Sequence, residues 1–218
     1  MLRDDWRLSG KQSVSCALIN RLRTSCVVDQ STVLIAAYAT ALWVTEGRKE
    51  STVVLAFEDG QAYPIRLLVR PSAKFHELAQ EMQSKIEAAG AHRRLALPVL
   101  MNIRSMPTSI VSHSVFNIAY LELELMPRIE DRLRFPASGY GGLNLILAVR
   151  PDEDVLALQF IYSSGGREFK AIEKLGLTLT RILKAAAEDS EAGIYQLGAN
   201  EHAIKPVLSP DQAPRFAF

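Results

Sequence analysis

The sequence has little of what disulfide-rich, metal-binding or nucleic-acid-binding proteins usually carry. Its 218 residues include two cysteines, Cys16 and Cys26, which are too few for a disulfide framework and lack metal-site spacing. Lys and Arg number 25 against 24 Asp and Glu, a balance that indicates neither a nucleic acid nor an anionic membrane as partner. We therefore expect free thiols, a cytoplasmic location, no metal, and no nucleic-acid or membrane partner.

The chain also lacks an apolar run long enough for a membrane-spanning helix. Its longest run, residues 32–44, has 13 residues, whereas a span needs about 20. The N-terminus has no apolar core of the kind found in signal peptides. Because the run is apolar on every side, it predicts a buried helix at about 31–45, with Asp29 or Ser31 at its start and Gly47 at its end.

The stretch VVLAFEDGQAYPIRLLV predicts a tight hairpin. Asp59-Gly60 readily supplies the positive φ values of a two-residue turn, which places the strands at about 52–58 and 61–69. Pro64 cannot donate to a strand ladder, so the second strand is expected at an edge of the sheet or with a local irregularity.

Two further helices follow from apolar residues at helical spacing. One is amphipathic, with Ser72 as its N-cap and Gly90 as its stop. The other is long, starts near Glu168 and packs on the sheet. The tail from Gly198 is rich in proline and polar residues and is expected to be extended.

The remaining patterns predict strands. In HSVFNIAYLELEL, which opens at His113, leucine and glutamate alternate, so one face of the sheet there should be exposed to solvent. GYGGLNLILAV and DVLALQFIY predict a second hairpin across the turn RPDED. The expected fold is α/β (α+β), a two-layer sandwich of a mixed, mostly antiparallel sheet with helices packed on it. It should form one unit at 1–197, followed by a tail at 198–218.

Several stretches resemble the C-terminal half of a nonribosomal peptide synthetase condensation domain. They are STVLIAAYATALWVTEG, STVVLAF, the run from YPIRLLV to EAAGAH, and the run from LNLILAV to TLTRIL. Pro64, Arg66 and Tyr162 take the places of the family's proline, arginine and tyrosine, and the likeness spans about residues 8–197. It implies a chloramphenicol-acetyltransferase-like half-domain. The chain departs from the family at 58–61, where a longer connection between the strands is usual.

The catalytic motif of that family, HHxxxDG, belongs to its N-terminal half, and no adjacent histidines occur here. We therefore transfer no catalytic residue and expect no catalysis by the chain alone. His113, between Ser112 and Ser114, is a weak candidate base, because neighbouring residues of a strand point to opposite faces. The competing interpretation is a polar residue at a strand end.

A glycine-bearing loop before the last helix offers a second candidate site. Its backbone and the arginine could cradle a phosphate such as that of a phosphopantetheine arm. The competing interpretation is a flexible start of the helix, and we expect no resident cofactor. The candidate residues are Ser164, Gly165, Gly166 and Arg167.

These expectations favour a noncatalytic half-module of nonribosomal peptide biosynthesis, acting by protein interaction or completing a split condensation domain. The alternatives are a stand-alone oligomeric acyltransferase of the same superfamily and a small-molecule binder that uses the remnant substrate channel. The expected partners are a second copy in a dimer or a peptide synthetase protein, with a carrier protein as a further candidate. The apolar helix at about 31–45 favours self-association, since it requires cover on more than one side.

Overall fold

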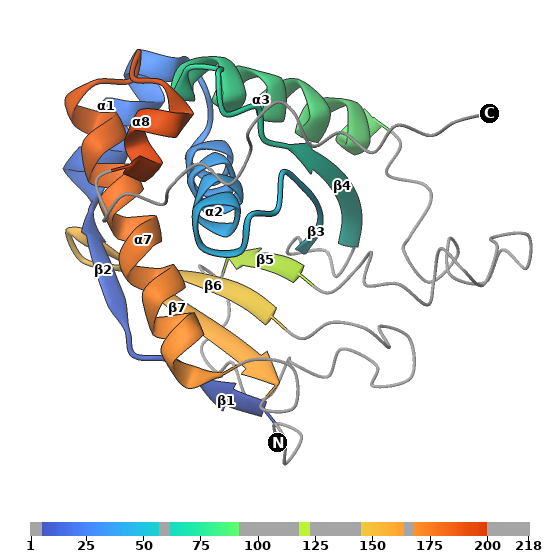
Figure 1. Cartoon of the computed structure of the whole chain (residues 1–218), viewed down its shortest axis with the longest axis vertical. Helices are drawn as coiled ribbons and strands as arrows, with labels where there is room; N and C mark the ends of the chain where they lie inside the picture. The colour runs from blue at the N-terminus through green and yellow to red at the C-terminus, as the bar shows by residue number, and fades with distance from the viewer. Residues whose placement is uncertain (1–5, 57–61, 92–117, 123–144, 164–167, 200–218) are drawn as a thin grey trace, which may run out of the picture.

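The computed structural model (Figure 1) describes residues 6–56, 62–91, 118–122, 145–163 and 168–199. The elements in chain order are β1 (Trp6–Leu8), β2 (Gln12–Ser15), α1 (Cys16–Cys26), α2 (Gln30–Glu46), β3 (Glu50–Ala56), β4 (Ala62–Leu68), α3 (Phe75–Ala91), β5 (Ile118–Glu122), β6 (Leu145–Asp152), β7 (Val155–Ser163), α7 (Phe169–Glu188) and α8 (Ile194–Ala199).

The described strands form one sheet in the order β1-β7-β6-β5-β3-β4, with β2 also paired to β7. Four pairings are antiparallel, namely β1–β7, β2–β7, β6–β7 and β3–β4. Only β5 pairs in parallel, with β3 on one side and β6 on the other. The predicted fold class, a mixed and mostly antiparallel sheet with helices on it, is confirmed.

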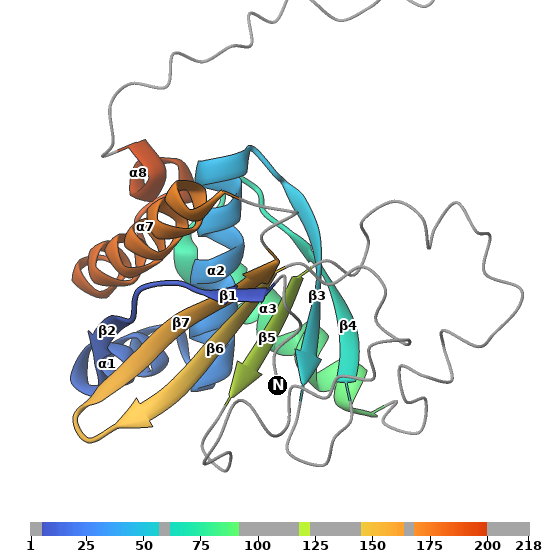
Figure 2. The same ribbon diagram turned by 90° about the horizontal axis from the view of Figure 1, so that it is seen from below.

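The helices gather on the concave side of this sheet, whose strands curve around α2 in Figure 1 and are seen from below in Figure 2. Eleven consecutive residues of α2, from Thr32 to Leu42, are buried. The helix packs against α7 and α3, while Tyr38 meets Phe160 of β7 with ring centroids 5.8 Å apart. The predicted all-round burial is confirmed, but the cover comes from the chain itself, so α2 gives no reason for self-association.

The ends of the helices only partly follow the predictions. Asp29 is the N-cap of α2 but its side chain makes no capping bond, and Gly47 ends the helix at φ 69° as expected. Ser72 is not a cap, because α3 starts three residues later at Phe75. Gly90 does not end that helix either, since it lies within the last turn.

The predicted hairpin exists as β3 and β4, and β4 is an edge strand, which confirms the prediction from Pro64. Its register pairs Ala56 with Ala62. A ladder that continued into a two-residue turn at Asp59-Gly60 would pair Ala56 with Tyr63 instead, so the observed register is shifted by one residue. The turn itself lies outside the described residues.

The second hairpin is also confirmed. In β6–β7 the last pair is Asp152 with Val155, and Glu153 between them has φ 54°. Strand β5 confirms the strand predicted after His113. The alternation of leucine and glutamate expected there continues outside the described residues.

Four elements were not predicted: β1, β2, α1 and α8. The first two pair with β7, and between them Ser9 continues the contact, because its hydroxyl accepts the amide of Phe160 at 2.9 Å. Gly198 and Ala199 belong to α8, so the expected tail boundary at 198 falls inside a helix. The rest of the tail, 200–218, lies outside the described residues.

Within the described ranges no single helix is long and apolar enough to cross a membrane. By length and composition α1 and α2 together would suffice, but the two helices are bent by 93° at their junction.

Candidate functional site

The candidate residues from the sequence lie outside the part of the chain that the structure describes. His113 falls in the gap at 92–117, and Ser164, Gly165, Gly166 and Arg167 fall in the gap at 164–167. The structure does describe the elements that flank the second gap, since β7 ends at Ser163 and Glu168 caps α7. Both candidate sites therefore remain predictions.

The one histidine that the structure describes, His76, belongs to a structural joint. Its Nδ1 lies 2.9 Å from a carboxylate oxygen of Glu191, whose other oxygen lies 2.6 Å from Nζ of Lys74. The hydrogen bond from Lys74 lowers the pKa of the Glu191 carboxyl. The amides of Phe75 and His76 donate to the carbonyls of Ala192 and Ser190. These contacts fix the start of α3 to the segment between α7 and α8.

The positions that carry the resemblance are structural as well. Tyr162 is only 4% exposed and belongs to the main hydrophobic core. Arg66 is exposed on the edge strand β4 and pairs with Glu50 of β3, an interaction that lowers the pKa of the Glu50 carboxyl. These side chains stabilise the half-domain and supply no reactive group.

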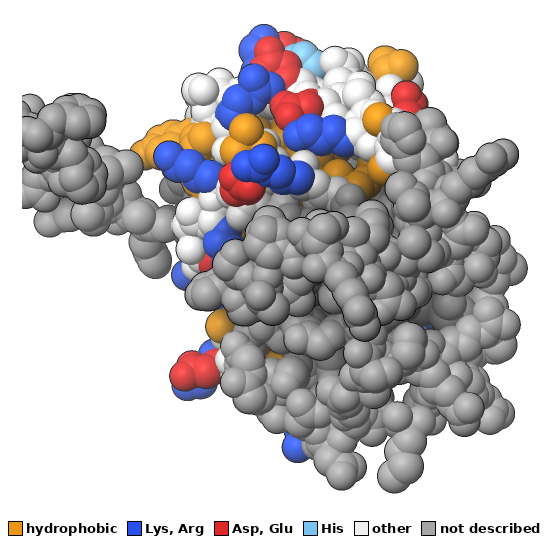
Figure 3. Space-filling view, turned by 90° about the vertical axis from the view of Figure 1, so that its right-hand side faces the viewer, with side chains coloured by type: hydrophobic (Ala, Val, Ile, Leu, Met, Phe, Trp, Pro, Cys, Tyr) orange, Lys and Arg blue, Asp and Glu red, His pale blue; other side chains and the backbone are white. Residues whose placement is uncertain are grey.

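The side of the molecule on which α3 and β4 lie in Figure 1 carries charges of both signs. Figure 3 shows acidic and basic side chains interspersed over its described part. Glu81 of α3 accepts from Arg70 at 2.8 Å and from Lys85 at 2.7 Å. The hydrogen bond from Lys85 is the main cause that lowers the pKa of Glu81. The cations of this group are paired with carboxylates on their own surface.

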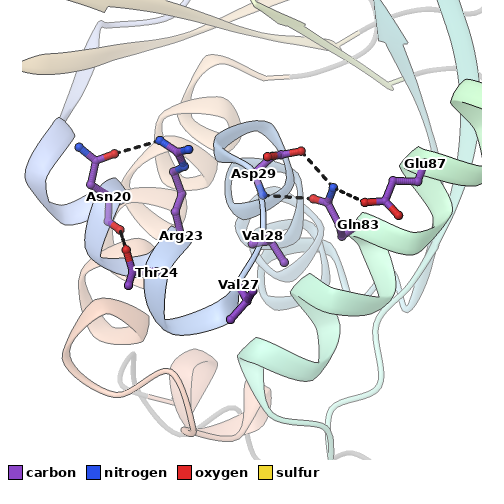
Figure 4. A pocket seen from close by; sticks show the side chains of 8 residues that line it. All are labelled: Asn20, Arg23, Thr24, Val27, Val28, Asp29, Gln83 and Glu87. Carbon is purple, nitrogen blue, oxygen red and sulfur yellow. Dashed lines mark hydrogen bonds between the residues drawn. The ribbon is translucent and has the colours of Figure 1, made fainter.

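A pocket of about 590 Å³ opens where the connection from α1 to α2 passes α3. Figure 4 shows its wall, which α1, the connection and α3 build together. The lining residues are Asn20, Arg23 and Thr24 of α1, Val27, Val28 and Asp29 of the connection, and Gln83 and Glu87 of α3.

The polar side of the pocket is organised by Gln83. Its Oε1 accepts from the amide of Asp29 at 3.1 Å and from the hydroxyl of Thr32 at 2.6 Å. Its Nε2 donates to the carboxylates of Asp29 at 3.0 Å and of Glu87 at 2.8 Å. One amide thus holds the start of α2 to α3. It accepts from the amide of the N-cap residue Asp29, as the glutamine of a capping box does, and its bond to the Asp29 carboxylate engages the group that would otherwise cap the helix.

The connection places an apolar residue at the rim of this pocket. Val27 ends α1 in the left-handed region at φ 58° and is 78% exposed. A β-branched residue is a rare occupant of that region. Behind it Cys26 is fully buried, and burial raises the pKa of its thiol, which makes it an inert core residue.

The pocket lining offers polar groups suited to recognition. It carries one arginine, two carboxylates and the hydroxyl of Thr24. That hydroxyl donates to the carbonyl of Asn20, so it is not paired with a base as an activated nucleophile is. Within the described ranges no group of three or more His, Cys, Asp or Glu side chains could hold a metal ion.

This pocket was not predicted from the sequence. Asp29 and Gln83 are 54 positions apart, and no local pattern links them. The helix α1, by contrast, had a usable signal, since its apolar residues Leu18, Ile19, Leu22 and Cys26 recur at helical spacing.

No protein-family model matches this sequence, and no curated protein matches it either. Solved structures do match its fold. The X-domain from teicoplanin biosynthesis aligns with a TM-score of 0.66 and 19% identity, over 86% of this chain and 49% of that chain. The complex of the X-domain and OxyB from the same biosynthesis gives 0.69 and 17%, over 88% and 48%.

A condensation domain gives the same result. The first condensation domain of the CDA synthetase aligns with a TM-score of 0.64 and 18% identity, over 89% of this chain and 49% of that chain. In each comparison 86–89% of this chain is matched, while the chain spans about half the length of its neighbour. The chain has the fold of half a condensation domain of the nonribosomal peptide synthetases.

Proposed function

We propose that this chain is a noncatalytic half-domain that works by binding another protein of nonribosomal peptide biosynthesis. One observation carries the proposal: the solved domains match 85–89% of this chain but only 46–49% of their own length. A protein with the other half of the fold, carrying the HHxxxDG motif, is the partner that would complete a split condensation domain.

The chemistry of the described residues supports a noncatalytic role. His76 is engaged with Glu191 in a structural joint, and the pocket between α1 and α3 has no paired nucleophile and base. A general base must lie within hydrogen-bond reach of the group that it deprotonates, and the described residues offer no such base beside a substrate-sized pocket.

A structural neighbour supports action through protein contacts. One of the solved structures is a complex of an X-domain with OxyB, in which a domain of this fold is bound to another protein. For this chain we propose binding in the same general sense, with a synthetase protein as partner.

The test is co-expression of this chain with a separately encoded N-terminal condensation half, followed by native mass spectrometry of the purified material. We expect a one-to-one complex, and we expect turnover of aminoacyl thioesters only when the second half is present. Turnover by the purified chain alone would overturn the noncatalytic role. A chain that stays monomeric and binds no synthetase protein would overturn the interaction role and favour a small-molecule binder.

A further inference from the structure

The outer face of α7 carries a row of basic side chains. Lys170, Lys174, Leu177, Arg181 and Lys184 follow one another at spacings of four and three residues. At 3.6 residues per turn they fall within an arc of roughly 80° and extend over about 21 Å of helix. The opposite face of the helix is the buried one. We call these five residues the α7 row.

The three lysines of the α7 row are exposed to solvent. Within the described residues no ion pair joins any of them to a carboxylate. Elsewhere on the surface Lys11 and Lys74 each lie 2.5–2.6 Å from a carboxylate oxygen. Like charges four residues apart on a helix repel each other, so the first two lysines of the row repel each other, and an acidic partner would relieve that repulsion. The exposed carboxylates Glu173 and Glu188 lie on or beside the same face, so the cations there outnumber the anions by four to two.

An exposed leucine lies at the centre of the row. Leu177 is 57% exposed, with cations before and after it along the same face. A large apolar side chain within a rim of charged side chains is the usual anatomy of an interface. A partner surface that complements the α7 row has an apolar residue flanked by carboxylates, and its side chains repeat along a straight line.

We propose that the α7 row is a docking surface for an acidic amphipathic helix of another protein. A helix fits because its own residues at three- and four-residue spacing match the period of the row. The inference deepens the proposed function and rests on it, since it takes the chain to work by binding a partner.

Other occupants fit the row less well. A second copy docked through the same face would set cations against cations across a two-fold axis. The chain's own residues 200–218 contain two acidic and two basic residues, so they supply no acidic helix. An anionic membrane requires a broad apolar face on the bound helix, and Leu177 is the one large apolar side chain of the row.

The probe is a fluorescent peptide of roughly 20 residues, long enough to be helical in isolation, with glutamates on both sides of a central leucine stripe. Its control is the same peptide with lysine in place of each glutamate. Binding to the full chain is measured by anisotropy at low and at high salt. The variants are Lys170→Glu/Lys174→Glu, Leu177→Ser, and a charge-matched control on other surfaces, Lys49→Glu/Arg150→Glu.

We expect the acidic peptide to bind, and binding to weaken as salt is raised. The Lys170→Glu/Lys174→Glu variant should bind roughly tenfold more weakly, whereas Lys49→Glu/Arg150→Glu should bind like the wild type. Folding of each variant is checked by circular dichroism. The charge reversals in α7 should be tolerated, because both positions are exposed and Lys170 lies in the first turn, where an acid is favourable.

Equal weakening by both double variants would overturn the proposal, because it would indicate attraction to net charge alone. Tighter binding to phosphatidylserine vesicles than to the peptide would overturn it in favour of a membrane. If the chain assembles with the N-terminal half but does not bind the peptide, the α7 row is not a docking surface and the proposed function stands. If the chain binds the peptide but does not assemble with the N-terminal half, the docking role of the α7 row is supported and the split-domain function is refuted.

Discussion

The close approach of α8 to α2 makes Gly198 sensitive to the smallest side chain. A Cβ added there would lie 2.8 Å from Cγ2 of Val44 and 3.3 Å from Cζ3 of Trp43. A relaxed contact between carbon atoms is about 3.5–4.0 Å, so the first pair would be too close by about 0.7–1.2 Å. Val44 cannot simply rotate away, since a β-branched side chain in a helix strongly prefers one rotamer.

The cost of Gly198→Ala follows from two opposing terms. Overpacking of this kind costs about 1–3 kcal/mol, whereas alanine in place of glycine gains up to about 1 kcal/mol in a helix. We expect the free energy of unfolding to fall by about 0.5–2 kcal/mol, measured by urea denaturation with an unchanged slope. Hydrogen exchange of the α8 amides should rise at the same time.

A matched variant separates the clash from the general effect of alanine. At Gly176 in α7 an added Cβ would lie 3.4 Å from Cγ of Gln12 and 3.5 Å from Cε2 of Phe160. These are ordinary contacts, so Gly176→Ala should stabilise the chain by about 0.5–1 kcal/mol.

A double-mutant cycle tests the cause directly. Val44→Ala removes the clashing methyl, so adding it to Gly198→Ala should recover about 1–2 kcal/mol relative to additivity. If Gly198→Ala unfolds at the same urea concentration as Gly176→Ala, or if the cycle shows no coupling, the close packing of α8 on α2 is refuted.

Three further outcomes are expected. Val27→Gly should raise the free energy of unfolding by about 0.5–1 kcal/mol in urea denaturation, because it relieves a β-branched residue at φ 58°; a loss of stability would contradict this. Leu183→Ala in the buried face of α7 should lower it by about 2–5 kcal/mol, and a smaller loss would mean that the site is loosely packed. The lowered pKa of Glu81 and Glu191 gives a contribution that is present above their ordinary value of 4.5 and is lost as the pH falls, whereas the raised pKa of Cys26 gives one that is present below 9.0 and is lost as the pH rises; Cys26→Ala should therefore reduce the alkaline loss in thermal melts across pH, leaving the part due to the raised pKa of Lys74, and an unchanged alkaline limb would refute that assignment.

Much of the fold was predictable where one residue property repeats. The run from Thr32 to Leu42 is apolar apart from two threonines, and the structure buries all of it. Pro64 indicated an edge strand because its missing amide hydrogen is a local property that no tertiary contact restores. Buried β6 and β7 were found from β-rich runs on both sides of a short polar turn.

Other features depend on contacts that the sequence does not display. Gln83, 54 positions away on another helix, accepts from the amide of Asp29 and donates to its carboxylate, so the side chain expected to cap α2 is bound across helices instead. Ser72 looked like a cap, yet Glu77 takes that role by accepting the amide of Lys74 at 3.0 Å. Gly198 looked like the start of a tail, although it lies where two helices come close. The first and last cases are tertiary interactions that override a local preference, whereas the contact of Glu77 with Lys74 is itself local.

The pairing of β1 and β2 with β7 joins the two ends of the described fold. Ser15 pairs with Val155, 140 positions later. During synthesis at about 5–20 residues per second, the N-terminal strands wait roughly 7–30 s for their partner to emerge. Their amides and carbonyls are unpaired strand edges throughout that time, which is the state most prone to pairing with other chains. The sheet is therefore completed late in synthesis, when β7 pairs with strands that were made early. The time for which β1 and β2 are open to pairing with other chains depends on the speed of translation.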